Sequence, residues 1–256
     1  MLMDCASLYS KRKSRFVLMA QKSIMRKYFT RVAMLILVTT IAGSSCRKNE
    51  LDPEPTQLGY SYFPTDSGTT WIYKVDSIVY KSFTTKGTID TVVYWVKHVI
   101  DGSFVDGVGH VNQKVTRYLS SDSGANFVFN NNFSMKVADF RAQVSDSAGT
   151  FVKIVFPPSL YQYWDGNSFN AKSTEEYQII AKSTKDFVQG IQYDSTIDVL
   201  HRDEEYFIQK RYGLEKYANH FGLIHKREIN YDIEVRDTVR VKKGYDCTYT
   251  LEKFIR

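Results

Sequence analysis

The sequence predicts a mainly β protein, with one antiparallel domain over residues 60–256 that is curved into a half-barrel or barrel and has few short helices. From residue 60 onward, apolar and polar residues alternate with period two, which is typical of strands that bury one face. The chain is also rich in aromatic residues, with 18 Tyr and 16 Phe among its 256 residues. A flat sheet of this size would leave one apolar face in water, so we expect it to curve.

The strands are expected in a regular order along the domain. Trp71, Tyr73 and Val75 alternate with more polar residues, and the run Ile89–Ile100 is rich in β-branched and aromatic residues. Residues 82–87 are suited to a hairpin connection between these two. The other expected strands are Val111–Leu119, Asn126–Phe129, Phe133–Phe140, Phe151–Phe156, Tyr177–Ala181, Gly190–Tyr193, Ser195–Leu200, Glu205–Leu214, Gly222–Asn230 and Tyr245–Phe254. The charged stretch 231–243 could extend a hairpin beyond the body of the domain.

Residues 159–175 are aromatic but lack a period, so we expect a loop. Its aromatic side chains either cover the core or are displayed as a contact surface, because aromatic faces suit sugars, peptides and apolar ligands alike. The second interpretation makes four residues candidates for ligand contact: Tyr161, Tyr163, Trp164 and Phe169.

The densest polar cluster is His201-Arg202-Asp203-Glu204-Glu205. We interpret it as a solvated hairpin turn between Val199-Leu200 and Tyr206-Phe207. The alternative is a pair of carboxyl groups for glycoside hydrolysis, which would have to lie roughly 5–10 Å apart in a cleft.

The charge of the chain is concentrated at its N-terminal end. The formal net charge is +6, but eight of the 34 basic residues and only one of the 28 acidic residues lie within 1–45. Residues 46–256 therefore hold 26 basic and 27 acidic residues, a net charge of −1. No basic stripe remains beyond Arg240–Lys243, so we expect no nucleic-acid partner.

The positive leader has the features of an export signal. Basic residues follow Met25, and the apolar run Val32–Ala42 would form roughly 16 Å of helix, about half of the ~30 Å bilayer core. We expect a signal peptide over 25–45 and, before it, an upstream extension or misassigned start over 1–24. Residues 46–59 are polar, with Pro53 and Pro55, and predict a flexible tether.

The end of this leader, Gly43-Ser44-Ser45-Cys46, resembles a bacterial lipobox. The resemblance implies that the thiol of Cys46 receives a diacylglyceryl group, although Gly43 stands where Leu is usual. Two or three acyl chains would then hold the protein on a membrane. The alternatives are an ordinary signal peptide cut nearby or an uncleaved amphipathic anchor.

Two segments of the domain strengthen this resemblance. Residues 62–73 (Tyr-Phe-Pro-Thr-Asp-Ser-Gly-Thr-Thr-Trp-Ile-Tyr) and 215–226 (Glu-Lys-Tyr-Ala-Asn-His-Phe-Gly-Leu-Ile-His-Lys) are similar to the two ends of a lipoprotein family of the Bacteroidota envelope. The second departs from the pattern, because His220 and Phe221 replace the usual Gly-Val. The resemblance implies a β-rich envelope lipoprotein and transfers no catalytic residues.

Other chemistry-bearing residues form no convincing site. Asp66-Ser67-Gly68 and Asp122-Ser123-Gly124 superficially resemble aspartic-protease loops but lack a preceding buried strand, so turns are the expected structure. The five histidines are scattered, and no metal or cofactor is expected, although a site assembled in three dimensions stays open. Cys247 is expected to be a small buried hydrophobe on a strand, with a catalytic thiol a remote second choice.

The sequence thus predicts a lipid-anchored, non-enzymatic envelope protein, on the outer membrane facing the periplasm or the cell surface. It would be a binding or structural module for an unknown glycan, peptide or lipid. The alternatives are a carrier or chaperone that holds a lipid or lipoprotein in an apolar cavity, and a glycan-active hydrolase. A continuous cavity of several hundred Å³ would favour the carrier.

Overall fold

The computed structural model describes residues 58–81, 88–235 and 239–256, all within the compact unit Pro53–Arg256. A short 3-10 helix, η1 (Tyr60–Tyr62), precedes fourteen strands in the described part of the chain. These strands are β1 (Thr70–Lys81), β2 (Thr88–Val105), β3 (Val111–Ser120), β4 (Val128–Ala138), β5 (Arg141–Asp146), β6 (Gly149–Val155), β7 (Tyr163–Asp165), β8 (Glu176–Ser183), β9 (Asp186–Val188), β10 (Ile191–Tyr193), β11 (Thr196–Tyr206), β12 (Gln209–Ala218), β13 (Gly222–Val235) and β14 (Val239–Ile255).

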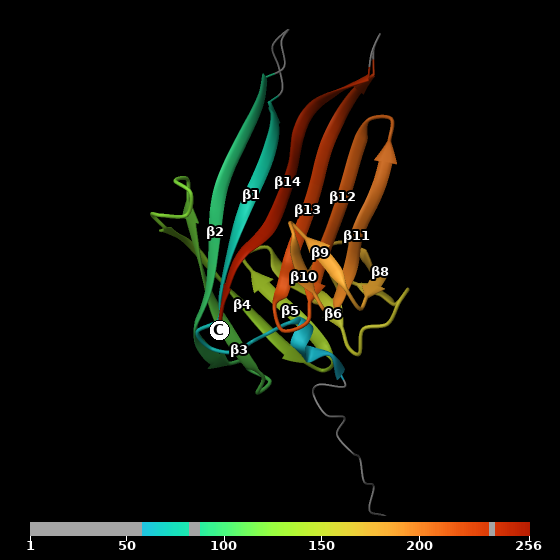
Figure 1. Cartoon of the computed structure of the whole chain (residues 1–256). Helices are drawn as coiled ribbons and strands as arrows, with labels where there is room; N and C mark the ends of the chain where they lie inside the picture. Colours follow the sequence, from blue (N-terminus) through green and yellow to red (C-terminus); the bar gives the residue numbers. More distant parts are fainter. Residues whose placement is uncertain (1–57, 82–87, 236–238) are drawn as a thin grey trace, which may run out of the picture. The chain divides into compact units, whose positions relative to one another are not determined.

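Twelve of these strands form one antiparallel sheet, in the order β6-β5-β4-β3-β2-β1-β14-β13-β12-β11-β8-β7 (Figure 1). Strands β9 and β10 form a separate hairpin. Most neighbours are consecutive along the chain, and the exception at the centre is β1, which pairs with the last strand, β14. The predicted curved antiparallel fold is therefore confirmed.

The two edges of the sheet meet, which nearly closes it into a barrel. The amide of Val152 in β6 donates to the carbonyl of Gly166, just after β7, at 2.9 Å. An isolated bridge between Thr150 and Phe169 continues the contact. An exposed edge would present unpaired backbone groups, and this contact satisfies some of them.

Three hairpins continue beyond the barrel. Figure 1 shows β1–β2, β11–β12 and β13–β14 reaching toward the same end, opposite η1. The β13–β14 pairing runs to Val235 and Val239, so the expected extension of this hairpin by the charged stretch is confirmed. On β14, Gly244 is required by close packing, because a Cβ there would lie 1.9 Å from the carbonyl oxygen of Asn230.

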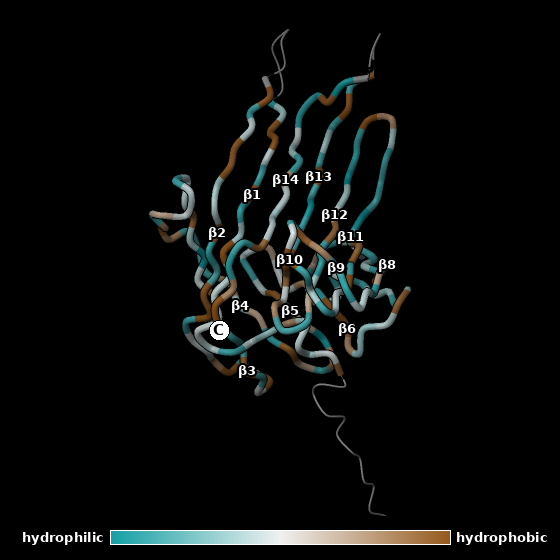
Figure 2. Tube along the Cα trace, viewed as in Figure 1, coloured by the Kyte–Doolittle hydropathy of each residue, from teal (hydrophilic) through white to brown (hydrophobic). Residues whose placement is uncertain are grey.

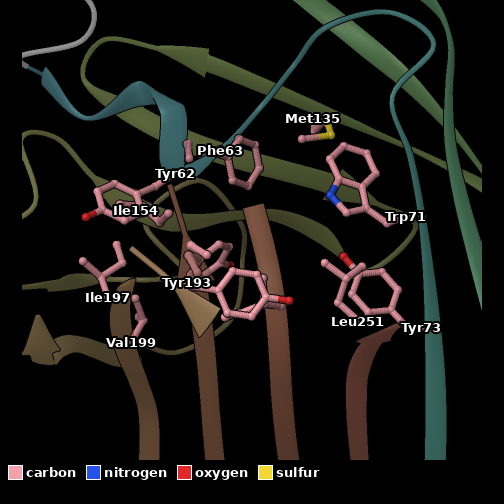
Figure 3. Packing of buried hydrophobic residues seen from close by; sticks show 14 of the residues in the cluster. Tyr62, Phe63, Trp71, Tyr73, Met135, Ile154, Tyr193, Ile197, Val199 and Leu251 are labelled. Atoms are coloured by element: carbon pink, nitrogen blue, oxygen red, sulfur yellow. The ribbon is translucent and has the colours of Figure 1, made fainter. Parts of the chain in front are cut away.

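The core lies inside the barrel (Figure 3). Inward positions of the period-two pattern supply it, as in β1, where Trp71, Tyr73 and Val75 are all buried. The polar groups of buried aromatic side chains also need hydrogen-bond partners. The indole N–H of Trp71, for example, donates to the carbonyl of Phe221 at 2.6 Å. Phe63 follows η1 directly and packs against Tyr217, which helps to close the end of the barrel next to η1.

Four local expectations are wrong. The segments Asn126–Phe129 and Phe133–Phe140 belong to one strand, β4, and residues 159–175 contain a short strand, β7. The cluster 201–205 is no turn, because it continues β11 to its pairing of Tyr206 with Gln209. The turn is instead formed by Phe207 and Ile208, whose side chains are exposed, and the tip of the β11–β12 hairpin has a hydrophobic colour in Figure 2. This turn divides the expected strand Glu205–Leu214 between β11 and β12.

Candidate functional site

The barrel contains a cavity of about 540 Å³. Aromatic and aliphatic side chains, among them Phe63, Trp71 and Met135, form part of its wall. Much of the rest is charged, with five basic and four acidic side chains. These are Arg117, Lys153, Arg202, Arg211, Lys226, Asp146, Glu175, Glu215 and Glu228.

Strand pairing brings the charged residues together. Glu215 on β12 pairs directly with Lys226 on β13, and alternation places Gly213 and Tyr217 on the same face as Glu215. Lys153 reaches the same point from β6, across the interior, and its Nζ lies 3.0 Å from Oε1 of Glu215. Since β6 and β12 are far apart in the order of the sheet, only the curvature of the sheet makes this contact possible.

Glu215 is the centre of this buried charge cluster. Its side chain is 4% exposed, and Oε2 accepts a hydrogen bond from the hydroxyl of Tyr217 at 2.5 Å. Nε2 of His201 lies 3.2 Å from Oε2, and Nζ of Lys226 lies 3.9 Å from Oε1. Burial alone would raise the pKa of Glu215, but the positive charges of Lys153 and Lys226 hold it well below its usual value. Glu215 is therefore ionised at neutral pH.

His201 is fixed in the cavity wall by stacking. Its ring lies parallel to that of Tyr177, with centroids 3.9 Å apart. Burial lowers the pKa of His201, against the opposing effect of Glu215, so the ring is neutral. Its Nε2 lacks an aligned hydrogen bond with any described residue. The sequence interpretation of this cluster as solvated is therefore wrong for His201.

The remaining residues of that cluster do not form a catalytic pair in the cleft. Arg202 lines the cavity and binds Glu175 at 2.9 Å. None of the three acidic residues, Asp203, Glu204 and Glu205, lines the cavity. Glu205 pairs with Lys210 near the tip of the β11–β12 hairpin instead.

Lys226 connects Glu215 to a second carboxylate. Its Nζ lies 3.0 Å from Oε2 of Glu228, and Oε1 of Glu228 accepts a hydrogen bond from the hydroxyl of Tyr245 at 2.6 Å. Burial would lower the pKa of Lys226, but Glu215 and Glu228 raise it above its usual value. Burial would raise the pKa of Glu228, but Lys226 and Tyr245 lower it. Both groups are therefore charged at neutral pH.

A separate basic group lines the cavity on β3. Nε of Arg117 donates to Nε2 of His98 at 2.9 Å, and its guanidinium lies 4.9 Å from the ring centroid of Phe133. The His98 ring makes edge contacts with Tyr73 and Phe133. Burial, with the nearby charges of Arg117 and Lys226, lowers the pKa of His98 to about 3, so this ring is neutral.

The four predicted ligand-contact residues divide into two groups. Tyr161, Tyr163 and Phe169 are 67%, 68% and 50% exposed. Trp164 instead packs on the core, makes an edge contact with Tyr177, and donates its indole N–H to the carbonyl of Val152 at 3.0 Å. The structure thus places Trp164 in the seam between the two sheet edges, and ligand contact by the three exposed residues stays a prediction.

We expect Trp164→Phe to lower the free energy of unfolding by about 1–2 kcal/mol, because it removes a seam hydrogen bond and part of a packed ring. Tyr163→Ala, at the neighbouring exposed position, should change it by less than about 0.5 kcal/mol. Urea denaturation of both variants measures the difference. Equal stabilities would show that Trp164 does not hold the seam.

The remaining sequence candidates occupy ordinary structural positions. Cys46, the leader and most of the tether lie outside the described residues. Cys247 is buried on β14, and burial raises the pKa of its thiol, in agreement with a structural role. Asp66 pairs with Arg256, whereas Asp122 accepts hydrogen bonds from Ser120 and Asn126 within its own turn, so the two do not form an aspartic-protease pair.

The described residues contain neither a metal-binding cluster nor a membrane-crossing helix. In the described ranges, no three His, Cys, Asp or Glu side chains are grouped so that they could hold a metal ion. The same ranges contain no helix with the length and apolar character needed to cross a membrane.

The sequence left open whether the sheet encloses a cavity, and it did not reveal the charged side chains that line it. Lys153 sits inside the apolar run Phe151–Phe156, and Glu215 occupies the same strand face as Tyr217. A charged residue at an inward position of a strand was the signal in the sequence that could have indicated a polar cavity. It could not be used, because the strand faces that point inward are defined only once the sheet order is known.

The comparisons with known proteins give two structural likenesses. No model of a protein family and no curated protein matches the chain. A candidate exported protein with a YmcC-like fold from Bacteroides fragilis is 11% identical, with a TM-score of 0.42, over 76% of this chain and 98% of that one. A candidate lipoprotein from Parabacteroides distasonis is 12% identical, with a TM-score of 0.36 and the same coverage of both chains.

Proposed function

We propose that this protein is a lipid-anchored, non-enzymatic binding protein of the cell envelope, which holds a small ligand in the barrel cavity. The cavity supports this proposal most directly, since its volume of about 540 Å³ lies within the range of roughly 300–1,000 Å³ usual for small-molecule sites. Its lining combines aromatic side chains with a few charged groups, as ligand sites do.

The state of Glu215 and Glu228, two of the four acidic side chains that line the cavity, supports a role without catalysis. Hydrolysis by a pair of carboxyl groups needs one of them protonated as a general acid, with a raised pKa. The pKa values of Glu215 and Glu228 are both lowered, so each is ionised at neutral pH. Buried charges that are fixed by partners in this way suit ligand orientation better than proton transfer.

The lipid anchor is part of the same proposal, and the sequence of the leader supports it. Cys46, directly after the leader, would be lipidated and would hold the protein on the outer membrane. We expect cells that are fed an alkyne analogue of palmitate to label the wild-type protein, whereas Cys46→Ala abolishes the label. Cys247→Ala is the matched control, because it removes a buried thiol and should leave the label intact. Labelling of Cys46→Ala at the wild-type level would contradict the anchor.

The cavity also favours a carrier as the second candidate function. In that role the ligand would be a lipid or the acyl group of a lipoprotein, and the protein would move it through the envelope. The ions at Lys153, Glu215 and Lys226 argue for a ligand that has a polar group as well as an apolar part, because a wholly apolar ligand would remove water from these ions and offer no hydrogen bond in its place.

Native mass spectrometry of protein purified from its own envelope tests the cavity. We expect the wild type to carry a small-molecule adduct and Val144→Trp, which adds an indole to the cavity wall, to lose it. Val128→Trp is the control, since Val128 is exposed on β4 and does not line the cavity. An adduct retained by Val144→Trp and lost from Tyr161→Ala or Tyr163→Ala would place binding on the exposed aromatic loop instead.

A further inference from the structure

The cavity contains one basic side chain that no carboxylate neutralises. Lys153 and Lys226 face Glu215 and Glu228, Arg202 binds Glu175, and Arg211 binds Asp232 at 3.0 Å. Arg117 has no acidic partner among the described residues. It is the exception in a cavity wall whose other cations are all paired.

The guanidinium of Arg117 is held in place by neutral groups. A guanidinium has five N–H donors and no acceptor. The bond from Nε therefore requires Nε2 of His98 to accept, which places the proton of that ring on Nδ1. Phe133 supports the plane of the guanidinium from one side. The side chain is thus fixed without the loss of its positive charge.

Four donors of this guanidinium remain unused by the protein. No described residue accepts a hydrogen bond from Nη1 or Nη2 of Arg117, and the side chain lines the cavity. The two Nη groups of a guanidinium form a planar fork that matches the two oxygens of a carboxylate. An anion bound there would satisfy these donors and neutralise the unpaired charge.

We propose that Arg117 is the specificity-determining residue of the cavity and binds the carboxylate of a small monoanionic ligand with an aromatic or aliphatic body. This inference rests on the proposed function and names its ligand class. The five basic and four acidic side chains that line the cavity sum to one positive charge, which one carboxylate balances. Tyr73 and Phe133, which both contact His98 beside the fork, provide the apolar surface for the body of the ligand.

A matched pair of probes tests the charge requirement. The full chain in phosphatidylcholine nanodiscs is titrated by calorimetry with 2-naphthoate and with its neutral analogue 2-naphthalenemethanol, and empty nanodiscs serve as the blank. We expect 2-naphthoate to bind the wild type about tenfold or more tightly than the alcohol, because a bidentate charged pair in a partly buried site is worth at least this much.

Two variants assign this preference to Arg117. Arg117→Met should remove the preference and leave the affinity for the alcohol within about twofold, since the aliphatic stem is kept. Arg117→Lys should retain part of it, because an ammonium keeps the charge but loses the fork. Arg227→Met is the matched control: Arg227 pairs with Asp246, is largely exposed and does not line the cavity.

The outcomes separate this inference from the proposed function. If both probes bind the wild type equally well, or if Arg117→Met keeps the preference, the cavity binds ligands but Arg117 does not select an anion, and the inference is wrong. If neither probe binds, both the inference and the proposed cavity function are contradicted. Should Arg117→Met fail to fold, the wild-type preference and its partial loss in Arg117→Lys decide the question.

Discussion

Replacing Glu215 by Gln is expected to lower the free energy of unfolding by about 3–5 kcal/mol, since removal of one partner of a buried ion pair leaves an uncompensated charge. Glu215 is the carboxylate closest to Lys153, and it also contacts His201, Lys226 and Tyr217. Glutamine keeps the size of the side chain, so the change tests the charge alone. Urea denaturation at pH 7 measures the loss.

A second substitution shows whether the cost comes from the unpaired lysine. Lys153→Met in the Glu215→Gln background should recover part of the lost stability, because Lys226 still pairs with Glu228. Glu205→Gln is the matched control: its carboxylate makes an exposed ion pair with Lys210, which is worth about 1 kcal/mol or less. A Glu215→Gln variant as stable as Glu205→Gln would show that the cluster does not hold the barrel together.

We also expect the protein to lose stability as the pH falls from about 6.5 to 5, because of its buried neutral histidines. The pKa of His98 is lowered to about 3 in the folded protein, whereas the unfolded value is near 6.5. Between these values the unfolded chain binds a proton that the folded chain does not, so acid favours unfolding. Each such histidine contributes about 1.4 kcal/mol per pH unit, and burial lowers the pKa of His201 in the same direction.

His98→Gln separates the contribution of His98 from the rest. The amide oxygen of Gln can still accept the hydrogen bond from Arg117, but the side chain does not titrate. The variant should therefore lose about 2 kcal/mol less than the wild type between pH 6.5 and 5. This range lies above the usual pKa of Glu, so carboxylates such as Glu215 add little to the slope there. Identical slopes in the two proteins would show that His98 titrates normally in the fold.

The fold class follows from the sequence, because period-two alternation at positions such as Trp71, Tyr73 and Val75 is a local property. The register and the closure of the sheet do not follow, because they depend on contacts between residues far apart in the chain. The pairing of β1 with β14 and the contact of Val152 with Gly166 are of this kind. A charged residue on a strand can face water or a polar cavity, and the pattern of the strand is the same in both cases.

The positions of His201 and Trp164 could not be predicted for the same reason. The polar cluster at 201–205 was expected in solvent because charge usually indicates exposure, yet His201 lies against Tyr177 inside the barrel. For Trp164 the sequence left core cover and ligand contact open, and the structure places its indole between the two sheet edges. In each case, a partner distant in sequence decides where the side chain lies.

The most direct test of the cavity as the ligand site uses Met135, the only methionine in the described part of the chain, which is buried and lines the cavity. Its methyl group, labelled with carbon-13, can be followed by NMR during titration with 2-naphthoate. We expect the Met135 signal to shift progressively and saturate in the wild type, and to stay in place in Val144→Trp. A Met135 signal that does not move while 2-naphthoate binds the protein would contradict a ligand site inside the barrel.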